Sequence, residues 1–104
     1  MALFRKKPIV IEAVQWWQPG DVPEVFHYEK IARKNEKMGV GWWNRLCEYC
    51  QQKMHIHGWM ETLEGGHIVC PSDWIITGVK SEKYPVKNNI FMLTYEMVET
   101  NEQI

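Results

Sequence analysis

Every cysteine of the chain, and three of its four histidines, lie between positions 47 and 70. The cysteines are Cys47, Cys50 and Cys70, and the histidines are His55, His57 and His67. Cys47 and Cys50 are separated by two residues, so one tight turn can present both thiolates to the same ion. Zn²⁺ then needs only two further sulfur or nitrogen ligands to complete a tetrahedron. The spacing therefore predicts a zinc site.

The other two ligands depend on how residues 57–70 pair with each other. The spacing H-x2-C at positions 67–70 is one alternative, but a hairpin that turns on Gly65-Gly66 sends His67 and Cys70 to opposite faces. In that register Glu61 faces Cys70, and His57 shares the face of Cys70. We therefore predict Cys47, Cys50, His57 and Cys70 as the ligands, with His55 and His67 as substitutes. A bulge at Cys70-Pro71 would restore His67.

Four protein ligands would close the coordination shell and leave no position for water, which predicts a structural zinc and no enzyme. The alternative is a metal-dependent hydrolase, in which three ligands and a water bind an open zinc and Glu61 acts as general base. A third interpretation has no metal, with the cysteines as small buried hydrophobes. No glycine motif for a nucleotide occurs, so we predict no catalytic residues and no organic cofactor.

Size and charge restrict the class of protein further. The 104 residues fit one domain, and the net charge of −1 gives no attraction to nucleic acid. No segment has the roughly 20 apolar residues that a membrane span requires, and the first residues lack the apolar region of a secretory signal. We therefore expect a cytoplasmic protein, in which an odd number of cysteines favours a metal site over disulfides.

The hydrophobic pattern predicts an α+β fold, with a small antiparallel, curled or barrel-like sheet, one or two short helices and a zinc knuckle. A helix is expected from Val22 to about Ile31, with Asp21 as its N-cap. Residues 38–41 should form a loop. The first strand is apolar on both faces, which predicts a central position. Strands are expected at residues 8–16, 58–63, 67–70, 74–79, 83–86 and 91–98.

Individual side chains carry further expectations. One member of each adjacent tryptophan pair, Trp16-Trp17 and Trp42-Trp43, should be exposed, because neighbours in an extended segment point to opposite faces. Glu12 shares a face with apolar residues and is expected to be a buried acid that pairs with a cation. Asp73 should cap a turn.

Several blocks of the sequence resemble one family. The opening segment 5–16, Thr62–Gly66, Cys70–Val79, Tyr84–Lys87, Ile90-Phe91 and Thr94–Glu96 are similar to small phage and prophage proteins grouped by a Pro-Gly-Asp-Tyr-type (PGDYG-like) signature. The chain departs from that pattern where Ser72 replaces the usual glycine, Val86 a usual cysteine, and Asn88-Asn89 the usual Pro-Asp. Residues 20–52 have no counterpart in the resemblance.

The resemblance implies a phage-encoded accessory protein in a bacterial cytoplasm and no particular reaction. On this interpretation residues 1–104 form one accessory domain that carries a Cys/His-bearing insert around residues 38–58. Its partner would be a host protein or a small molecule such as a nucleotide, bound by tryptophan stacking and basic side chains. An exposed strand edge could also pair two copies into a homodimer.

Overall fold

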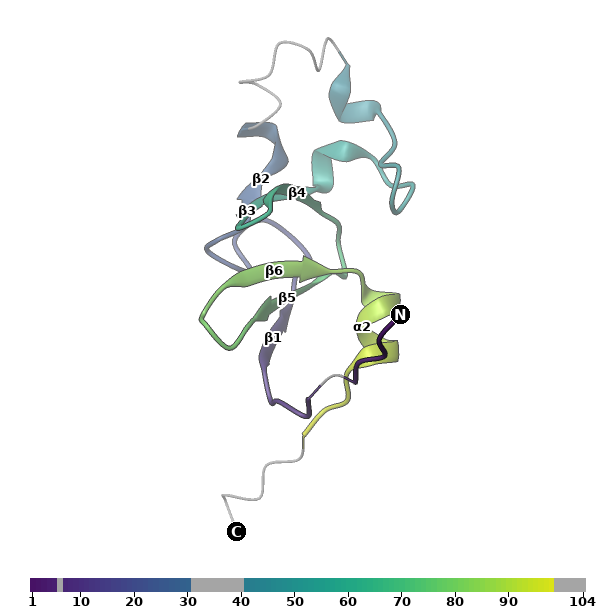
Figure 1. The fold of residues 1–104 in the computed structure, drawn as a ribbon. Coiled ribbons are helices and arrows are strands. Elements are labelled where there is room, and N and C mark those ends of the chain that lie inside the picture. Colours follow the sequence, from purple (N-terminus) through teal and green to yellow (C-terminus); the bar gives the residue numbers. More distant parts are fainter. Residues whose placement is uncertain (6, 31–40, 99–104) are drawn as a thin grey trace.

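The structure is a computed structural model that describes residues 1–5, 7–30 and 41–98. The predicted α+β class with antiparallel strands is confirmed. The strands form two three-stranded sheets, in the orders β1-β5-β6 and β2-β3-β4. Figure 1 shows the two sheets one above the other, with the single-turn 3₁₀ helices η2 (Trp42–Asn44) and η3 (Met54–Ile56) beyond the second sheet. The described strands do not close into a barrel.

The first sheet has β5 (Trp74–Thr77) between β1 (Glu12–Gln15) and β6 (Lys83–Val86). The predicted hairpin between β5 and β6 is confirmed, and its turn is closed by a hydrogen bond of 2.7 Å from the Gly78 N–H to the Glu82 carbonyl. The prediction of a central first strand is wrong, because β1 pairs with β5 on one edge only and is shorter than expected.

The second sheet contains the hairpin that carries two of the predicted ligands at its open end. Its strands are β3 (Gly58–Thr62) and β4 (Gly65–Val69), and β2 (Phe26–His27) pairs with the start of β3. The turn lies at Leu63-Glu64, two residues before the predicted Gly65-Gly66. Glu61 therefore pairs with Gly66, and the predicted pairing of Glu61 with Cys70 is wrong.

The hairpin β3–β4 separates two clusters of buried side chains. One face contributes Met60 and Val69 to a core that also contains Trp16, Val22, Val25 and Ile75. The other face contributes Trp59 and Ile68, which pack against a second cluster of Tyr28, Cys47, Met54 and Cys70. The candidate metal ligands therefore belong to the smaller, separate core.

The last predicted strand, residues 91–98, is wrong: α2 spans Asn88–Thr94. An apolar run of this length fits either a strand or a helix. The helix brings Phe91 and Tyr95 onto one face, where their rings stack with centroids 5.1 Å apart. Phe91 also stacks on Trp74 of β5 at 4.2 Å, and the Trp74 indole N–H donates to Asn88. These aromatic contacts fix α2 against the sheet.

The predicted helix from Val22 is also wrong over its first residues. The Asp21 carboxylate accepts hydrogen bonds from the N–H groups of Trp17 and Gln18, so it caps the turn that precedes it and not a following helix. A turn at Val22–Val25 leads into β2, and helical residues begin at 28. Residues 28–30 of the predicted helix are thus helical, whereas Ile31 and most of the expected loop at 38–41 lie outside the described residues.

The expectation for the extended pair Trp16-Trp17 is confirmed, whereas Trp42-Trp43 lie in the 3₁₀ helix η2 and not in an extended segment. Trp16 is fully buried while Trp17 is 56% exposed, and Trp43 is more exposed than its half-buried neighbour Trp42. The expectation for Glu12 is wrong, because this side chain lies exposed on the outer strand β1.

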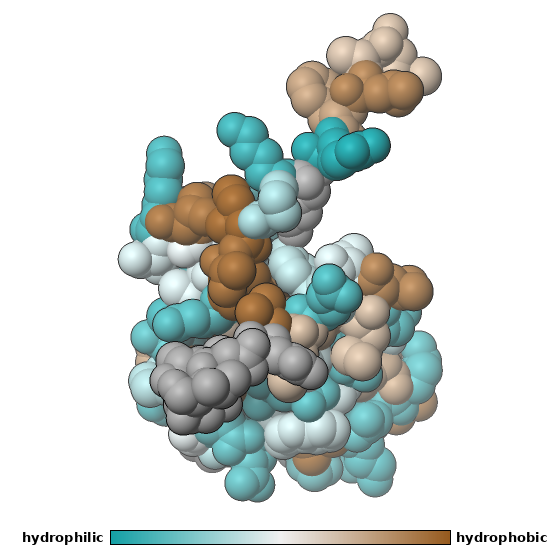
Figure 2. Space-filling view, turned by 90° about the horizontal axis from the view of Figure 1, so that it is seen from below, coloured by the Kyte–Doolittle hydropathy of each residue, from teal (hydrophilic) through white to brown (hydrophobic). Residues whose placement is uncertain are grey.

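Large apolar side chains remain exposed at one end of the molecule. Met92 and Leu93 of α2 are exposed, as are Leu3 and Phe4 near the N-terminus. Figure 2 shows apolar side chains gathered on the face that is seen from below. Among the residues that the structure describes, no helix is long and apolar enough to cross a membrane.

Ser72 has φ 83°, a left-handed conformation that side chains with a Cβ adopt at a cost of about 1–2 kcal/mol. Its N–H donates to the Trp16 carbonyl at 2.8 Å and its own carbonyl accepts from Gln15, so the conformation is fixed. We expect Ser72→Gly to raise the free energy of unfolding by about 0.5–1 kcal/mol in urea titrations. Ser72→Ala is the matched control, because it keeps the Cβ and should give no gain. A loss of stability in Ser72→Gly would contradict the argument.

Candidate metal centre

The Cys47-x2-Cys50 segment forms a tight turn. The Cys47 N–H donates to the Gln52 carbonyl at 2.8 Å, and the Gln51 N–H donates to the Cys47 carbonyl at 2.9 Å. Gln51 has φ 65°, which lets the chain reverse directly after Cys50. The Tyr49 N–H points at the Cys47 sulfur, 3.4 Å away. This backbone donor can stabilise negative charge on that sulfur.

His57 follows η3 and is fully buried. Its Nδ1 lies 2.9 Å from the Lys53 carbonyl oxygen. A carbonyl can only accept, so Nδ1 carries the proton and Nε2 keeps a free lone pair. Nε2 points at the Cys50 sulfur, 3.1 Å away. Burial lowers the pKa of His57, against the opposing effect of the Lys53 hydrogen bond, so the ring is neutral and able to bind a metal near pH 7.

Cys70 follows β4 directly and is almost fully buried. The ladder pairs Gly58 with Val69, and one further step places His57 opposite Cys70. The Cys70 sulfur lies 3.7 Å from that of Cys47. Burial raises the pKa of the Cys70 thiol well above its ordinary value, although the Lys87 ammonium acts against this. Without a metal Cys70 is therefore a neutral thiol.

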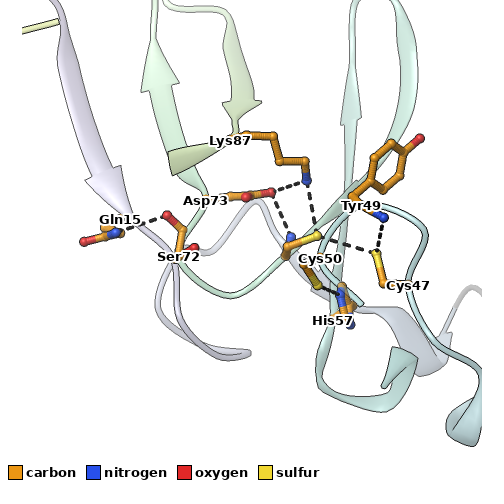
Figure 3. A network of polar contacts seen from close by, with 9 residues as sticks. Gln15, Cys47, Tyr49, Cys50, His57, Ser72, Asp73 and Lys87 are labelled. Atoms are coloured by element: carbon orange, nitrogen blue, oxygen red, sulfur yellow. Dashed lines mark hydrogen bonds and ion pairs between the residues drawn. The ribbon is translucent and has the colours of Figure 1, made fainter. Parts of the chain in front are cut away.

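The structure brings Cys47, Cys50, His57 and Cys70 together, with their four ligand atoms all within 4.8 Å of one another. A tetrahedral zinc with bonds of about 2.3 Å to sulfur places two sulfurs about 3.8 Å apart. The distance between the Cys47 and Cys70 sulfurs is close to that value. Figure 3 shows Cys47 and Cys50 of the turn together with His57, which precedes β3, and Cys70 follows β4. The arrangement is compatible with a metal site.

Asp73 and Lys87 lie directly behind the Cys70 sulfur. Asp73 is 2% exposed, and its Oδ2 accepts from the Cys70 N–H at 2.8 Å and from the Lys87 ammonium at 2.7 Å. Lys87 also contacts the Cys70 sulfur at 3.2 Å and lies over the Tyr49 ring. Burial acts to lower the pKa of Lys87, but Asp73 and Cys70 outweigh it and raise the pKa above its ordinary value.

The predicted role of Asp73 as a turn cap agrees with its hydrogen bond to the Cys70 N–H. Lys87 was not among the predicted site residues. It is 17 positions from Cys70 along the chain, and a single lysine after a strand gives no signal of its own. Only the β5–β6 hairpin, which was predicted, returns the chain to this point.

The structure separates the two substitute histidines from the cluster. His55 lies exposed on η3, and its backbone carbonyl accepts a hydrogen bond from His27 Nε2 at 2.8 Å. His67 pairs with Met60 on the opposite face of the hairpin from Cys70 and is exposed. Neither belongs to the group of converging ligand atoms.

A cavity of about 350 Å³ opens beside the cluster. Tyr49 and Trp59 contribute aromatic rings to its lining, Ile68 and Pro85 are apolar, and Lys87 and Asp73 are its charged groups. The Trp59 ring lies against Gly66, where a Cβ would collide with it, and the indole N–H donates to Glu61. Glycine at position 66 thus allows the wall of the cavity to form.

Comparison of the chain with models of protein families, with curated proteins and with solved structures finds no match.

The histidines at positions 55, 57 and 67 allow a direct test of the ligand set. His57→Ala should weaken metal binding by more than the roughly 10–100-fold that loss of an outer hydrogen-bond partner costs. His55→Ala and His67→Ala are the matched controls, and both should keep one metal ion with wild-type affinity, measured by competition with a chromophoric chelator. Equal loss in His67→Ala would show that His67 binds the ion instead.

Proposed function

We propose that the protein is a non-enzymatic binding module whose fold is held by one structural zinc ion on Cys47, Cys50, His57 and Cys70. The observation that carries the proposal is the convergence of these four ligand atoms within 4.8 Å. Four protein ligands complete a tetrahedron, which is the arrangement of structural zinc sites.

The donor set favours zinc over other metals. Three thiolates and one imidazole are soft or borderline ligands, whereas Mg²⁺ and Ca²⁺ require oxygen. The C-x2-C turn and the single histidine match the Cys₃His type of structural zinc site. Such a site also stabilises folding, because the unfolded chain does not hold the ligands together.

The geometry disfavours an open, hydrolytic zinc. Glu61, the expected general base, lies four residues beyond His57 along β3 and is exposed. At about 3.3 Å per residue this separation is roughly 13 Å, too far for a proton transfer at the metal. Its carboxylate also accepts a hydrogen bond from Trp59 at 2.9 Å. These features support a structural centre.

A binding role is supported by two surfaces. The cavity beside the cluster has the size of a small-molecule site and combines two aromatic rings with an ammonium group. The exposed apolar side chains of α2 and the N-terminal residues offer a second surface, suited to a protein partner or a second copy. The resemblance to small phage and prophage proteins favours a host protein or small molecule as the partner and the bacterial cytoplasm as the location.

Native mass spectrometry of reduced protein, expressed without added metal, tests the zinc. We expect a mass increment of one zinc ion, and we expect a strong chelator to remove both the ion and the compact charge distribution, because ligand assembly and folding are coupled. Freshly purified, folded protein with no metal would overturn the proposal.

The same preparations separate a structural from a hydrolytic zinc. Zinc-loaded protein should hydrolyse neither aryl phosphates nor aryl esters above the rate of buffer, and chelator-sensitive turnover would instead favour the hydrolase.

Small-molecule binding in the cavity is testable by thermal shift with nucleoside monophosphates, nucleoside diphosphates and aromatic carboxylates as probes. A probe that binds should raise the melting temperature of the wild-type protein and not that of Tyr49→Ala. Tyr49 is 59% exposed, so its removal should cost little stability. Trp17→Ala, which changes an exposed aromatic residue that does not line this cavity, is the control and should respond as wild type. If none of these probes shifts the protein, the cavity is not a site for them.

A further inference from the structure

Cys70, Asp73 and Lys87, which are all ionisable, form a closed ring of contacts beside the ligand cluster. The Cys70 N–H donates to Asp73 Oδ2 at 2.8 Å, the Lys87 ammonium contacts the same oxygen at 2.7 Å, and Lys87 contacts the Cys70 sulfur at 3.2 Å. Asp73 and Cys70 are 2% and 1% exposed, so these two members of the ring are buried. Figure 3 shows the Lys87 amine directed at the Asp73 carboxylate.

From this geometry we infer that Lys87 is a positioning residue for the metal, which lets Cys70 bind as a thiolate beside a buried carboxylate. The inference rests on the proposed zinc site. Three thiolates and one neutral imidazole around Zn²⁺ carry a net charge of −1, and the Asp73 carboxylate adds another negative charge nearby. Two buried negative charges in proximity are costly unless a cation lies between them, and Lys87 contacts both groups.

Asp73 also accepts a backbone hydrogen bond, which explains why a side chain with an acceptor oxygen is present here. It accepts the Cys70 N–H and so fixes the backbone of the last ligand at the corner between β4 and β5. An asparagine at this position could still accept that hydrogen bond but would carry no charge. Removal of Lys87 therefore weakens zinc binding because the Asp73 carboxylate is left without a cation. Replacement of Asp73 by a neutral residue should restore part of the zinc affinity.

A double-mutant cycle at pH 7.4 tests the inference, with zinc affinity measured by chelator competition. Lys87→Met should weaken zinc binding about 10–100-fold, the range found when outer partners of metal ligands are removed. Lys87→Arg, which keeps the charge, should stay within about threefold of wild type. Asp73→Asn combined with Lys87→Met should bind zinc about tenfold more tightly than Lys87→Met alone. Lys83→Met removes one positive charge from the start of β6, where Lys83 bonds to Thr77 and not to the cluster, and should leave the affinity unchanged.

With cobalt in the site, recovery of the absorbance by Asp73→Asn provides a readout that loss of packing alone would not produce. The thiolate-to-Co²⁺ charge-transfer absorbance of Lys87→Met should be lower than that of wild type at equal cobalt, and Asp73→Asn in the same chain should restore it. Wild-type affinity in Lys87→Met, or no recovery in the double variant, would overturn the inference. If Lys87→Met fails to fold even with excess zinc, Lys87→Gln carries the same expectations. Failure of both variants to fold would show that Lys87 is required for folding and would also overturn the inference. Absence of zinc from the wild-type protein would instead overturn the proposed function.

Discussion

Cys70 is the residue on which the two parts of the structure depend. It follows β4 and lies opposite His57, and its sulfur contacts that of Cys47 in the tight turn. Its N–H donates a hydrogen bond to Asp73, which precedes β5. Three segments that are distant in sequence therefore meet at one side chain. Any metal bound there would join the turn, the hairpin β3–β4 and, through Lys87, the end of β6.

The division of the interior into two clusters explains why such a junction is needed. One cluster is entirely hydrophobic and lies between the sheets around Trp16, while the other contains Cys47, Cys70, Met54 and Tyr28. Small domains bury a limited fraction of their apolar surface, and splitting the core reduces what each part contributes. The second cluster is where thiols take the place of larger hydrophobes, so a zinc ion would supply the stabilisation that apolar packing there does not.

The sequence predicted the strands of both hairpins and the residues that now converge, but for a partly incorrect reason. The expected turn at Gly65-Gly66 was displaced, yet the true register differs by an even number of residues, and side chains alternate with a period of two. Cys70 and His57 therefore remain on one face and His67 on the other. Where the local pattern fitted more than one structure, contacts between residues selected among them. Stacking on Trp74 favours a helix at Phe91 over the expected strand. The Asp21 carboxylate accepts from the N–H of Trp17, before it in the chain, and so does not cap the expected helix. Lys87 could not be found from sequence, since its role exists only after the β5–β6 hairpin forms.

The candidate ligands divide between the predicted insert around residues 38–58 and the rest of the chain. Cys47, Cys50 and His57 lie within those residues, whereas Cys70, Asp73 and Lys87 lie after them. Ser72, at the corner that holds Cys70 and Asp73, has φ 83°, a conformation that glycine adopts without penalty. The ring of Cys70, Asp73 and Lys87 thus requires none of the other three ligands. Without residues 38–58, the same corner would hold a single buried thiol, and a metal would be an addition built onto a contact that the fold already contains.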